Sequence, residues 1–182
     1  LSYAPILGRS FAAKAAILRE ALHPAGISAG AISPIAGMDH PMFFRNKLSF
    51  SIGAGVAGIV CGFHERGSAA RVVSARACVL QSPASQDIVR RIELRLARTD
   101  PLRWPSRVVV REGRRTGERM VILTWLGAPC DADAWADEVG DLATSIVVGA
   151  ADGGTARVVT GDGVLRERLG PDRLVAAGTL GT

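Results

Sequence analysis

Thiols are the groups in this sequence best suited to nucleophilic or metal chemistry, and there are three: Cys61, Cys78 and Cys130. None belongs to a CxxC pair. An odd, widely spaced set argues against a disulfide framework and favours a reducing compartment such as the cytoplasm. An iron–sulfur cluster usually needs four thiolates, which this chain cannot supply. Taken alone, Cys78 is better interpreted as a small buried residue than as a metal ligand.

Patterns for acid–base work and nucleotide binding are weak. His64 and Glu65 are neighbours, and neighbours in a strand point to opposite faces. The three histidines are too far apart in sequence for a zinc pattern. The Gly-rich segment 149–154 would need a following helix to bind a phosphate, but residues 155–160 are β-branched and favour a hairpin. We therefore predict no catalytic residue and no cofactor-binding loop in this chain.

Cationic side chains alternate with apolar ones in the segment FFRNKLSFSI, residues 43–52. A period of two predicts a half-buried strand with Arg45 and Lys47 on its outer face and Phe43 beside them. Two cations and an aromatic ring suit a nucleic acid, because phosphates bind the cations and a base stacks on the ring. An ordinary solvated strand face would show the same pattern.

A second cationic group lies in segment 90–119, which holds ten Arg and four acidic residues. A helix and a hairpin tip of this density could rest on phosphates, with Arg114 and Arg115 at the tip. The alternative is two solvated surfaces neutralised by local ion pairs, such as Glu93 with Arg90 or Arg98. The residues alone leave these two interpretations equally open.

Periodicity and turn residues place these groups on a run of strands and helices. Ser82 and Pro83 are a typical helix start, and the apolar period that follows predicts a helix ending before Asp100. The glycines of EGRRTGE predict a hairpin between two β-branched strands. The other expected elements are a helix at 10–23 capped by Ser10, a Gly- and Pro-rich linker at 24–40, strands at 59–63, 71–75, 107–111, 119–126, 145–149 and 157–160, and a short acidic helix at 131–142 started by Asp131.

The composition is that of a folded domain with a basic front half. Of 182 residues 48% are apolar, and no apolar run is long enough for a membrane span. Residues 1–119 carry 18 Arg and Lys against 8 Asp and Glu, which is compatible with a nucleic-acid partner. We predict an α+β fold, an antiparallel sheet with two or three helices. Its expected parts are an N-terminal helix and linker at 1–40, a central α+β domain at 41–168, and a truncated tail without clear period at 169–182.

Five short segments carry a family resemblance: LSYAPILGRSFAAK at 1–14, FFRNKLSF at 43–50, GFHERG at 62–67, ACVLQSP at 77–83 and VREGRRTGE at 110–118. In this order they resemble segments of the tRNA and 23S rRNA uracil-C5 methyltransferases. The resemblance runs from residue 1 to about 168. Segment 170–182 departs from the family at the point where its cofactor contacts begin.

The resemblance implies a central domain that serves chemistry carried out elsewhere. In this family it lies between an oligonucleotide-binding barrel and a Rossmann-like domain that binds S-adenosylmethionine. A cysteine thiolate adds to C6 of a flipped uridine, C5 takes the methyl group of the cofactor, and a carboxylate removes the C5 proton. These groups all belong to the Rossmann-like domain, which no segment of this chain matches.

Two roles carry over residue by residue as implications of the resemblance. Cys78 corresponds to the last of four cysteines that hold a 4Fe–4S cluster in many members, the other three lying before Leu1. Arg45 and Lys47 correspond to a strand near the RNA path. We therefore expect a monomeric fragment that binds rRNA or tRNA and supports a cluster. The alternatives are a stand-alone, non-enzymatic module that binds RNA or a protein partner, and a degenerate fragment without function.

Overall fold

The computed structural model describes residues 4–28, 30, 32–38, 40–56, 58–151, 156–170 and 173–178. The chain forms two compact units, residues 1–41 and residues 42–182. Within the described ranges, no helix combines the length and the apolar character that crossing a bilayer requires.

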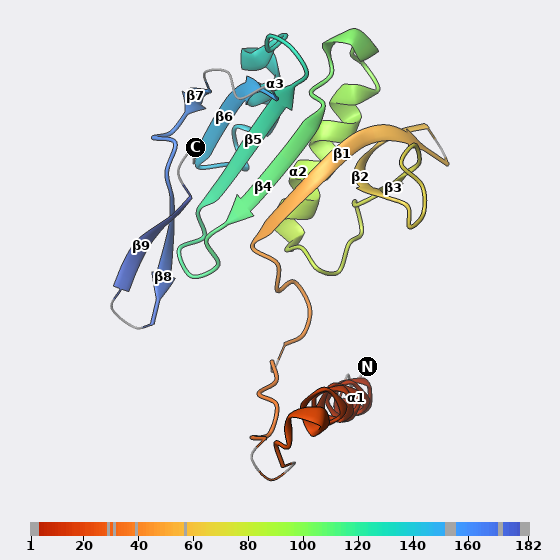
Figure 1. Cartoon of the computed structure of the whole chain (residues 1–182). Coiled ribbons are helices and arrows are strands. Elements are labelled where there is room, and N and C mark those ends of the chain that lie inside the picture. The colour runs from red at the N-terminus through yellow and green to blue at the C-terminus, as the bar shows by residue number, and fades with distance from the viewer. Residues whose placement is uncertain are drawn as a thin grey trace. The chain divides into compact units, whose positions relative to one another are not determined.

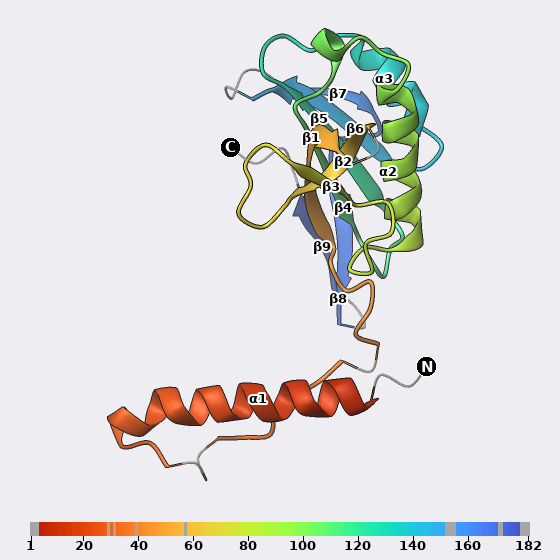
Figure 2. The ribbon, with the colours of Figure 1, turned by 90° about the vertical axis from the view of Figure 1, so that its right-hand side faces the viewer.

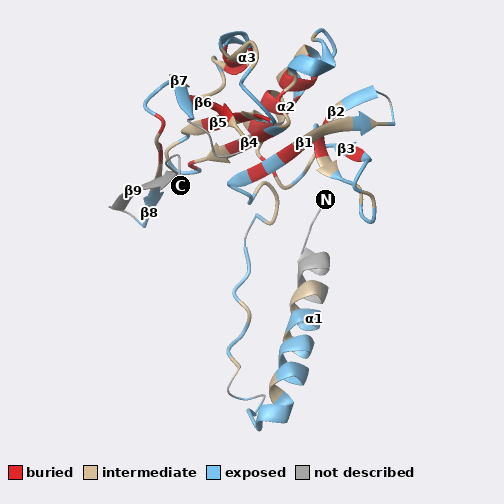
Figure 3. Ribbon diagram, turned by 45° about the horizontal axis from the view of Figure 1, so that its top comes forward, coloured by how far each residue is buried: buried red, intermediate tan, exposed pale blue. Residues whose placement is uncertain are grey.

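The first unit contains helix α1 (Ala4–Leu22) and a 3-10 turn, η1 (His23–Ala25). The helix begins at Ala4 and not at residue 10, so Ser10 lies inside it and the predicted cap is wrong. Pro5 explains the earlier start, because the N–H that proline lacks has no partner in the first turn of a helix. Most described residues of α1 are exposed (Figure 3).

The second unit is built on a seven-stranded sheet in the order β3-β2-β1-β4-β5-β6-β7 (Figure 1). All neighbouring strands are antiparallel except β5 and β6, which run parallel. The predicted α+β fold with a mostly antiparallel sheet is thereby confirmed. The strands are β1 (Lys47–Gly55), β2 (Gly58–His64), β3 (Val72–Ser74), β4 (Arg107–Glu112), β5 (Arg119–Trp125), β6 (Ser145–Ala150) and β7 (Arg157–Thr160).

Helices α2 (Pro83–Leu96) and α3 (Ala132–Val139) cover one face of this sheet (Figure 2). The predicted start of α2 is confirmed, because the Ser82 side chain accepts a hydrogen bond from the Ser85 N–H at 3.1 Å. Asp131 precedes α3 as expected, but its side chain makes no cap. Its carboxylate pairs instead with Arg103 at 3.0 Å. A second 3-10 turn, η3 (Pro101–Arg103), connects α2 to β4.

The core lies between the sheet and these two helices. The alternation along β1 buries Leu48 and Phe50, which are 3% and 0% exposed. Burying each such side chain stabilises the fold by about 1.5–3 kcal/mol. The core also takes in, from the helices and the neighbouring strands, Ile88, Val89, Ile92, Leu96, Val108, Val110, Val121, Leu123, Trp135, Val139, Ile146 and Val148.

The strand expected at 43–52 begins later than its alternation indicates. Phe43 has a left-handed backbone, with φ of 56°. Its N–H donates to the carbonyl of Val79 at 2.8 Å, and the N–H of Arg45 donates to that of Leu80 at 3.0 Å. The backbone of residues 43–45 therefore pairs with the connection between β3 and α2 and not with the sheet. Phe44, expected in the core, is 43% exposed.

The tail holds regular structure that its sequence does not predict. Strand β8 (Leu165–Leu169) pairs antiparallel with β9 (Arg173–Gly178), although the sequence of the tail shows no clear period. The Gly-rich connection expected to be a hairpin joins β6 to the antiparallel strand β7. Residues 152–155 of that connection lie outside the described ranges.

Candidate nucleic-acid interface

The face of the sheet opposite α2 and α3 carries cations on two neighbouring strands. The register places Lys47 opposite Arg111 and Ser51 opposite Arg107. Directly opposed residues of adjacent strands share a face, and the residues next to Lys47 and Ser51 along β1 point into the core. Strands β1 and β4 therefore present Lys47, Arg107 and Arg111 on one side of the sheet.

Arg45 and Lys47 lie where a polyanion could reach them. Both side chains are exposed. Among the residues that the structure describes, no acidic group forms an ion pair with Arg45, Lys47 or Arg107. A cation without an internal partner can neutralise a phosphate without first breaking a contact.

Arg107 was missed by the sequence analysis, although a signal for it existed. The segment RVVVR has the same period of two as β1, which puts Arg107 and Arg111 on one face of β4. Only the pairing of β4 with β1 shows that this face is also the face of Lys47.

Phe43 does not stand in line with the two cations as the alternation predicted. Its side chain is half-buried, and its left-handed backbone lies before the first residue of β1. The backbone of Phe43 is therefore tied to the connection between β3 and α2 and is not part of β1. A stacking role for Phe43 stays a prediction.

Cys78 lies in this same connection, next to the backbone of residues 43–45. The loop is firmly held: the Cys78 N–H donates to Ala75 O at 3.0 Å, and Cys78 O accepts from Gln86 Nε2 at 3.2 Å. Its thiol is half-buried. Within the described ranges no group of three or more His, Cys, Asp or Glu could hold a metal ion. By itself this chain does not fit a cluster, and Cys78 could supply one ligand.

Cys61 is a structural residue rather than a nucleophile. It is fully buried, and its N–H donates to Glu93 Oε1 at 3.0 Å. Burial, and to a lesser degree the negative charge of Glu93, raises the pKa of the Cys61 thiol far above its usual range. Since the thiolate is the reactive form, this cysteine is unsuited to covalent chemistry.

Arginines of α2 and of the turn that follows it are engaged in ion pairs within the protein. Arg91 pairs with Asp141 at 3.1 Å, and Arg98 pairs with Glu138 at 2.9 Å. The pair suggested between Glu93 and Arg98 is wrong, because Glu93 is only 5% exposed and faces the sheet. Ion pairing within the protein therefore describes this helix better than a phosphate-binding surface does.

The tip of the β4–β5 hairpin contacts the β8–β9 hairpin. The N–H groups of Arg114 and Arg115 donate to the carboxylate of Glu167 at 2.6 and 3.1 Å. The Arg115 guanidinium donates to Gly170 O at 2.9 Å. Arg115 is thus committed to a contact within the chain, whereas the exposed Arg114 side chain has no such partner among the described residues. The predicted RNA contacts of both stay predictions.

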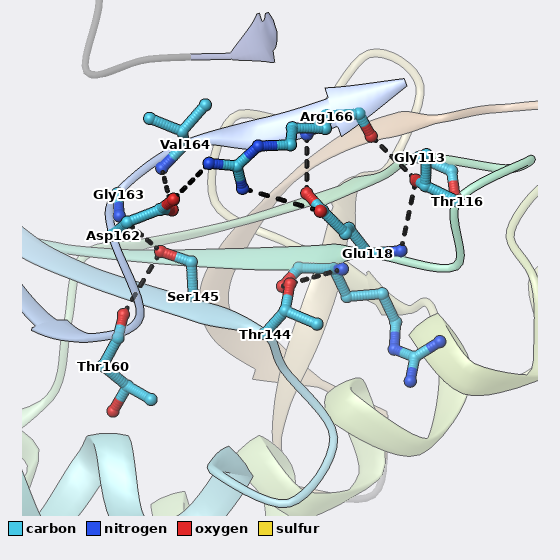
Figure 4. A network of polar contacts seen from close by, with 11 residues as sticks. Gly113, Thr116, Glu118, Thr144, Ser145, Thr160, Asp162, Gly163, Val164 and Arg166 are labelled. Carbon is cyan, nitrogen blue, oxygen red and sulfur yellow. Dashed lines mark hydrogen bonds and ion pairs between the residues drawn. The ribbon is translucent and has the colours of Figure 1, made fainter. Parts of the chain in front are cut away.

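A polar network fixes β8 against the same hairpin (Figure 4). Glu118 Oε2 accepts from the Arg166 N–H at 2.7 Å, and Thr116 Oγ1 donates to Arg166 O at 2.8 Å. The Arg166 guanidinium pairs with Asp162, and this hydrogen bond holds the pKa of Asp162 below its usual value.

Two further features fix the segment around β8. The Ser145 hydroxyl of β6 accepts a hydrogen bond from the Gly163 N–H at 3.1 Å. Gly113 is required here, because a Cβ would lie 2.2 Å from Arg166 O.

The relatives found by comparison with known proteins are RNA methyltransferases. No protein-family model matches the chain. An RNA methyltransferase of Halalkalibacterium halodurans is 30% identical over 110 residues, which cover 56% of this chain and 24% of that protein. One of Thermosynechococcus vestitus is 26% identical over 141 residues, which cover 71% of this chain and 30% of that protein. The chain thus spans less than a third of the length of these relatives.

The fold has a counterpart among solved structures. The tRNA (uracil-54, C5)-methyltransferase of Pyrococcus abyssi, in complex with S-adenosyl-L-homocysteine, superposes with a TM-score of 0.51 at 21% identity. The match covers 76% of this chain and 36% of that one. The chain is thus similar in sequence to RNA methyltransferases and similar in fold to part of one, and the resemblance that its five motif segments indicate is confirmed.

Proposed function

We propose that this chain is the RNA-handling part of an S-adenosylmethionine-dependent RNA (uracil-5-)-methyltransferase that acts on tRNA or rRNA. The observation that carries the proposal is the set of cations on the helix-free face of the sheet. Lys47 and Arg107 are exposed there, and Arg45 precedes Lys47 at the start of β1. The similarity to RNA methyltransferases supports RNA as the polyanion.

The placement of charge favours this face over α2 as the proposed RNA-binding surface. Arginine presents a planar fork that matches a phosphate, and its binding is strongest where no carboxylate competes. On α2 the guanidinium of Arg91 is already paired with an acidic residue, Asp141, which follows α3. Lys47 and Arg107 on the helix-free face, and Arg45 just before β1, form no ion pair with an acidic group among the described residues.

In this proposal the chain binds and positions the substrate, and the methyl transfer takes place in another part of the protein. S-adenosylmethionine would supply the methyl group. Of the three thiols, Cys61 is held protonated by burial and cannot attack a base. Cys78 is proposed as one ligand of a 4Fe–4S cluster in the intact protein. Replacing it, as Cys78→Ser, should abolish the cluster's visible absorbance in the complete gene product; an unchanged spectrum would exclude the ligand role.

Binding of single-stranded RNA to the 182-residue chain tests the interface directly. The double variant Arg45→Ala with Lys47→Ala should weaken binding, and the slope of log K against log salt should fall by roughly 1 to 1.5, as expected for two lost phosphate contacts. The matched control is Arg90→Ala with Arg91→Ala, which removes the same charge from α2. Equal losses in both double variants would reject the interface and leave only a general effect of charge.

Methylation by the complete gene product tests the activity. Incubation with methyl-labelled S-adenosylmethionine and either tRNA or rRNA transcripts should yield 5-methyluridine in one of them. Binding of RNA without any label transfer would favour the non-enzymatic module instead. The transcript that is labelled identifies the RNA class.

A further inference from the structure

A hollow of about 630 Å³ lies at the end of the sheet where β4 begins. Its wall is mainly apolar and includes Trp104, Trp125, Leu102 and Leu126, while Ser51 and His64 add polar groups. The volume falls within the range of sites that hold small organic molecules. None of these residues was singled out for binding by the sequence.

The aromatic wall of the hollow is fixed before any ligand arrives. The indole N–H of Trp104 donates to Thr99 O at 2.9 Å, and that of Trp125 donates to Arg103 O at 3.2 Å. Because both N–H groups are used within the protein, the rings offer apolar surface. Leu102 and Leu126 are also in the wall, and their side chains are 90% and 83% exposed. Together they add exposed apolar surface to the hollow.

The hollow adjoins the cationic face. Ser51 lines it, and Ser51 lies directly opposite Arg107 on β4. Arg107 follows Ser106, another residue of the wall. A phosphate on Arg107 would therefore stand at the edge of the hollow, with Lys47 further along the same face.

We propose that the hollow receives an unpaired nucleobase of the RNA whose phosphates bind Arg107 and Lys47. The inference rests on the function proposed above and adds a base-stacking site to it. An apolar, aromatic hollow next to Arg107 and Lys47 matches a chain whose bases stack through their π-faces and whose backbone is anionic. A protein partner would explain the leucines but not the cations beside them.

Tryptophan fluorescence of the 182-residue chain reports directly on this site. Trp135 is fully buried and Trp125 is 3% exposed, so Trp104 is the indole that a stacked base can reach best. Oligouridylate should quench the emission, and an abasic oligomer of the same length should bind roughly tenfold more weakly without quenching, because it has no base to stack. Trp104→Phe should remove most of the quenching.

The outcomes separate the two proposals. Equal binding of both oligomers without quenching overturns the base site and leaves phosphate binding intact. No binding of either oligomer overturns the function proposed for the face, and the base site with it.

Variants at the rim test the position of the site. The double variant Leu102→Ser with Leu126→Ser should weaken the binding of oligouridylate about tenfold and leave the binding of the abasic oligomer unchanged. Leu94→Ser, at a leucine of α2 that is 56% exposed, is the control and should change neither. If the rim variant alters self-association and not RNA binding, the hollow is a protein-docking surface and the proposal is wrong.

Discussion

Lys47 on β1 lies directly opposite Arg111 on β4, so two side chains of like charge are cross-strand neighbours. Such pairs destabilise a sheet by about 0.2–1 kcal/mol. Lys47 is also one of the cations proposed to bind phosphate. Glu112 and Glu167 line the same pocket as Lys47 and Arg111.

Replacing Lys47 should therefore separate binding from stability. We expect Lys47→Ala to weaken RNA binding uniformly across sequences and to lower the slope of log K against log salt by roughly 0.7. The free energy of unfolding, measured in urea, should be unchanged or slightly higher. Filter binding over a series of salt concentrations measures the slope. Lys14→Ala, at the other lysine of the chain, is the control and should alter neither; a large loss of stability in Lys47→Ala would contradict the assigned role.

Sequence patterns predicted the elements whose signals are local. The Ser82–Pro83 start of α2 and the glycines of the β4–β5 turn fix those elements through nearby residues, and both were placed correctly. The alternation in β1 correctly separated the buried residues Leu48 and Phe50 from the exposed Lys47. Local periodicity does not show that a strand has ended, which is why Phe43 was placed in β1.

Features that depend on distant partners could not be predicted from the sequence. Strand β8 reads LRERL, whose charges look like a solvated tail, and it is held by the hairpin tip through Glu118 and Thr116. Arg91 of α2 pairs with Asp141, and Arg98 just after α2 pairs with Glu138 of α3, so both partners lie 40 to 50 residues later in the chain. The hollow brings together residues from 51 to 128, so no single segment carries its signal.

Glu93 should matter for stability far more than its position in an arginine-rich helix suggests. Its carboxylate accepts hydrogen bonds from the Cys61 N–H at 3.0 Å and the Ser74 hydroxyl at 2.9 Å, and it pairs with Arg76 at 2.6 Å. It thereby ties β2 and β3 to α2. Glu93→Ala should lower the free energy of unfolding by about 3 kcal/mol, measured in urea, because buried donors lose their acceptor.

An exposed ion pair provides the control for this variant. Glu65 pairs with Arg71 at 2.9 Å, and both side chains are largely exposed. Glu65→Ala should cost less than about 0.5 kcal/mol. Comparable losses at Glu93 and Glu65 would show that burial does not set the difference.

Cys61 should resist thiol reagents in the folded protein. In a chain with Cys78→Ser and Cys130→Ser, iodoacetamide should label Cys61 only when urea unfolds it, because burial and Glu93 raise the pKa of its thiol. The raised pKa also makes the free energy of unfolding depend on pH. Below the ordinary value of 9.0 the thiol is protonated in both states, and above it only the unfolded chain ionises, so stability falls as pH rises past 9. Native labelling at the rate of a free thiol would contradict this.

Glu167 should hold the two hairpins together in a pH-dependent way. Burial raises the pKa of its carboxyl, but the N–H groups of Arg168, Arg115 and Arg114 lower it by more, so the net shift is downward from 4.5. A depressed pKa means that the contact is fully present above pH 4.5 and is lost as the pH falls through the lowered value. Glu167→Gln should speed hydrogen exchange of the Arg114 and Arg115 amides by about tenfold, or ~1.4 kcal/mol, while global unfolding changes little. Glu65→Gln is the control, and unchanged protection of both amides in Glu167→Gln would show that other contacts hold the hairpins.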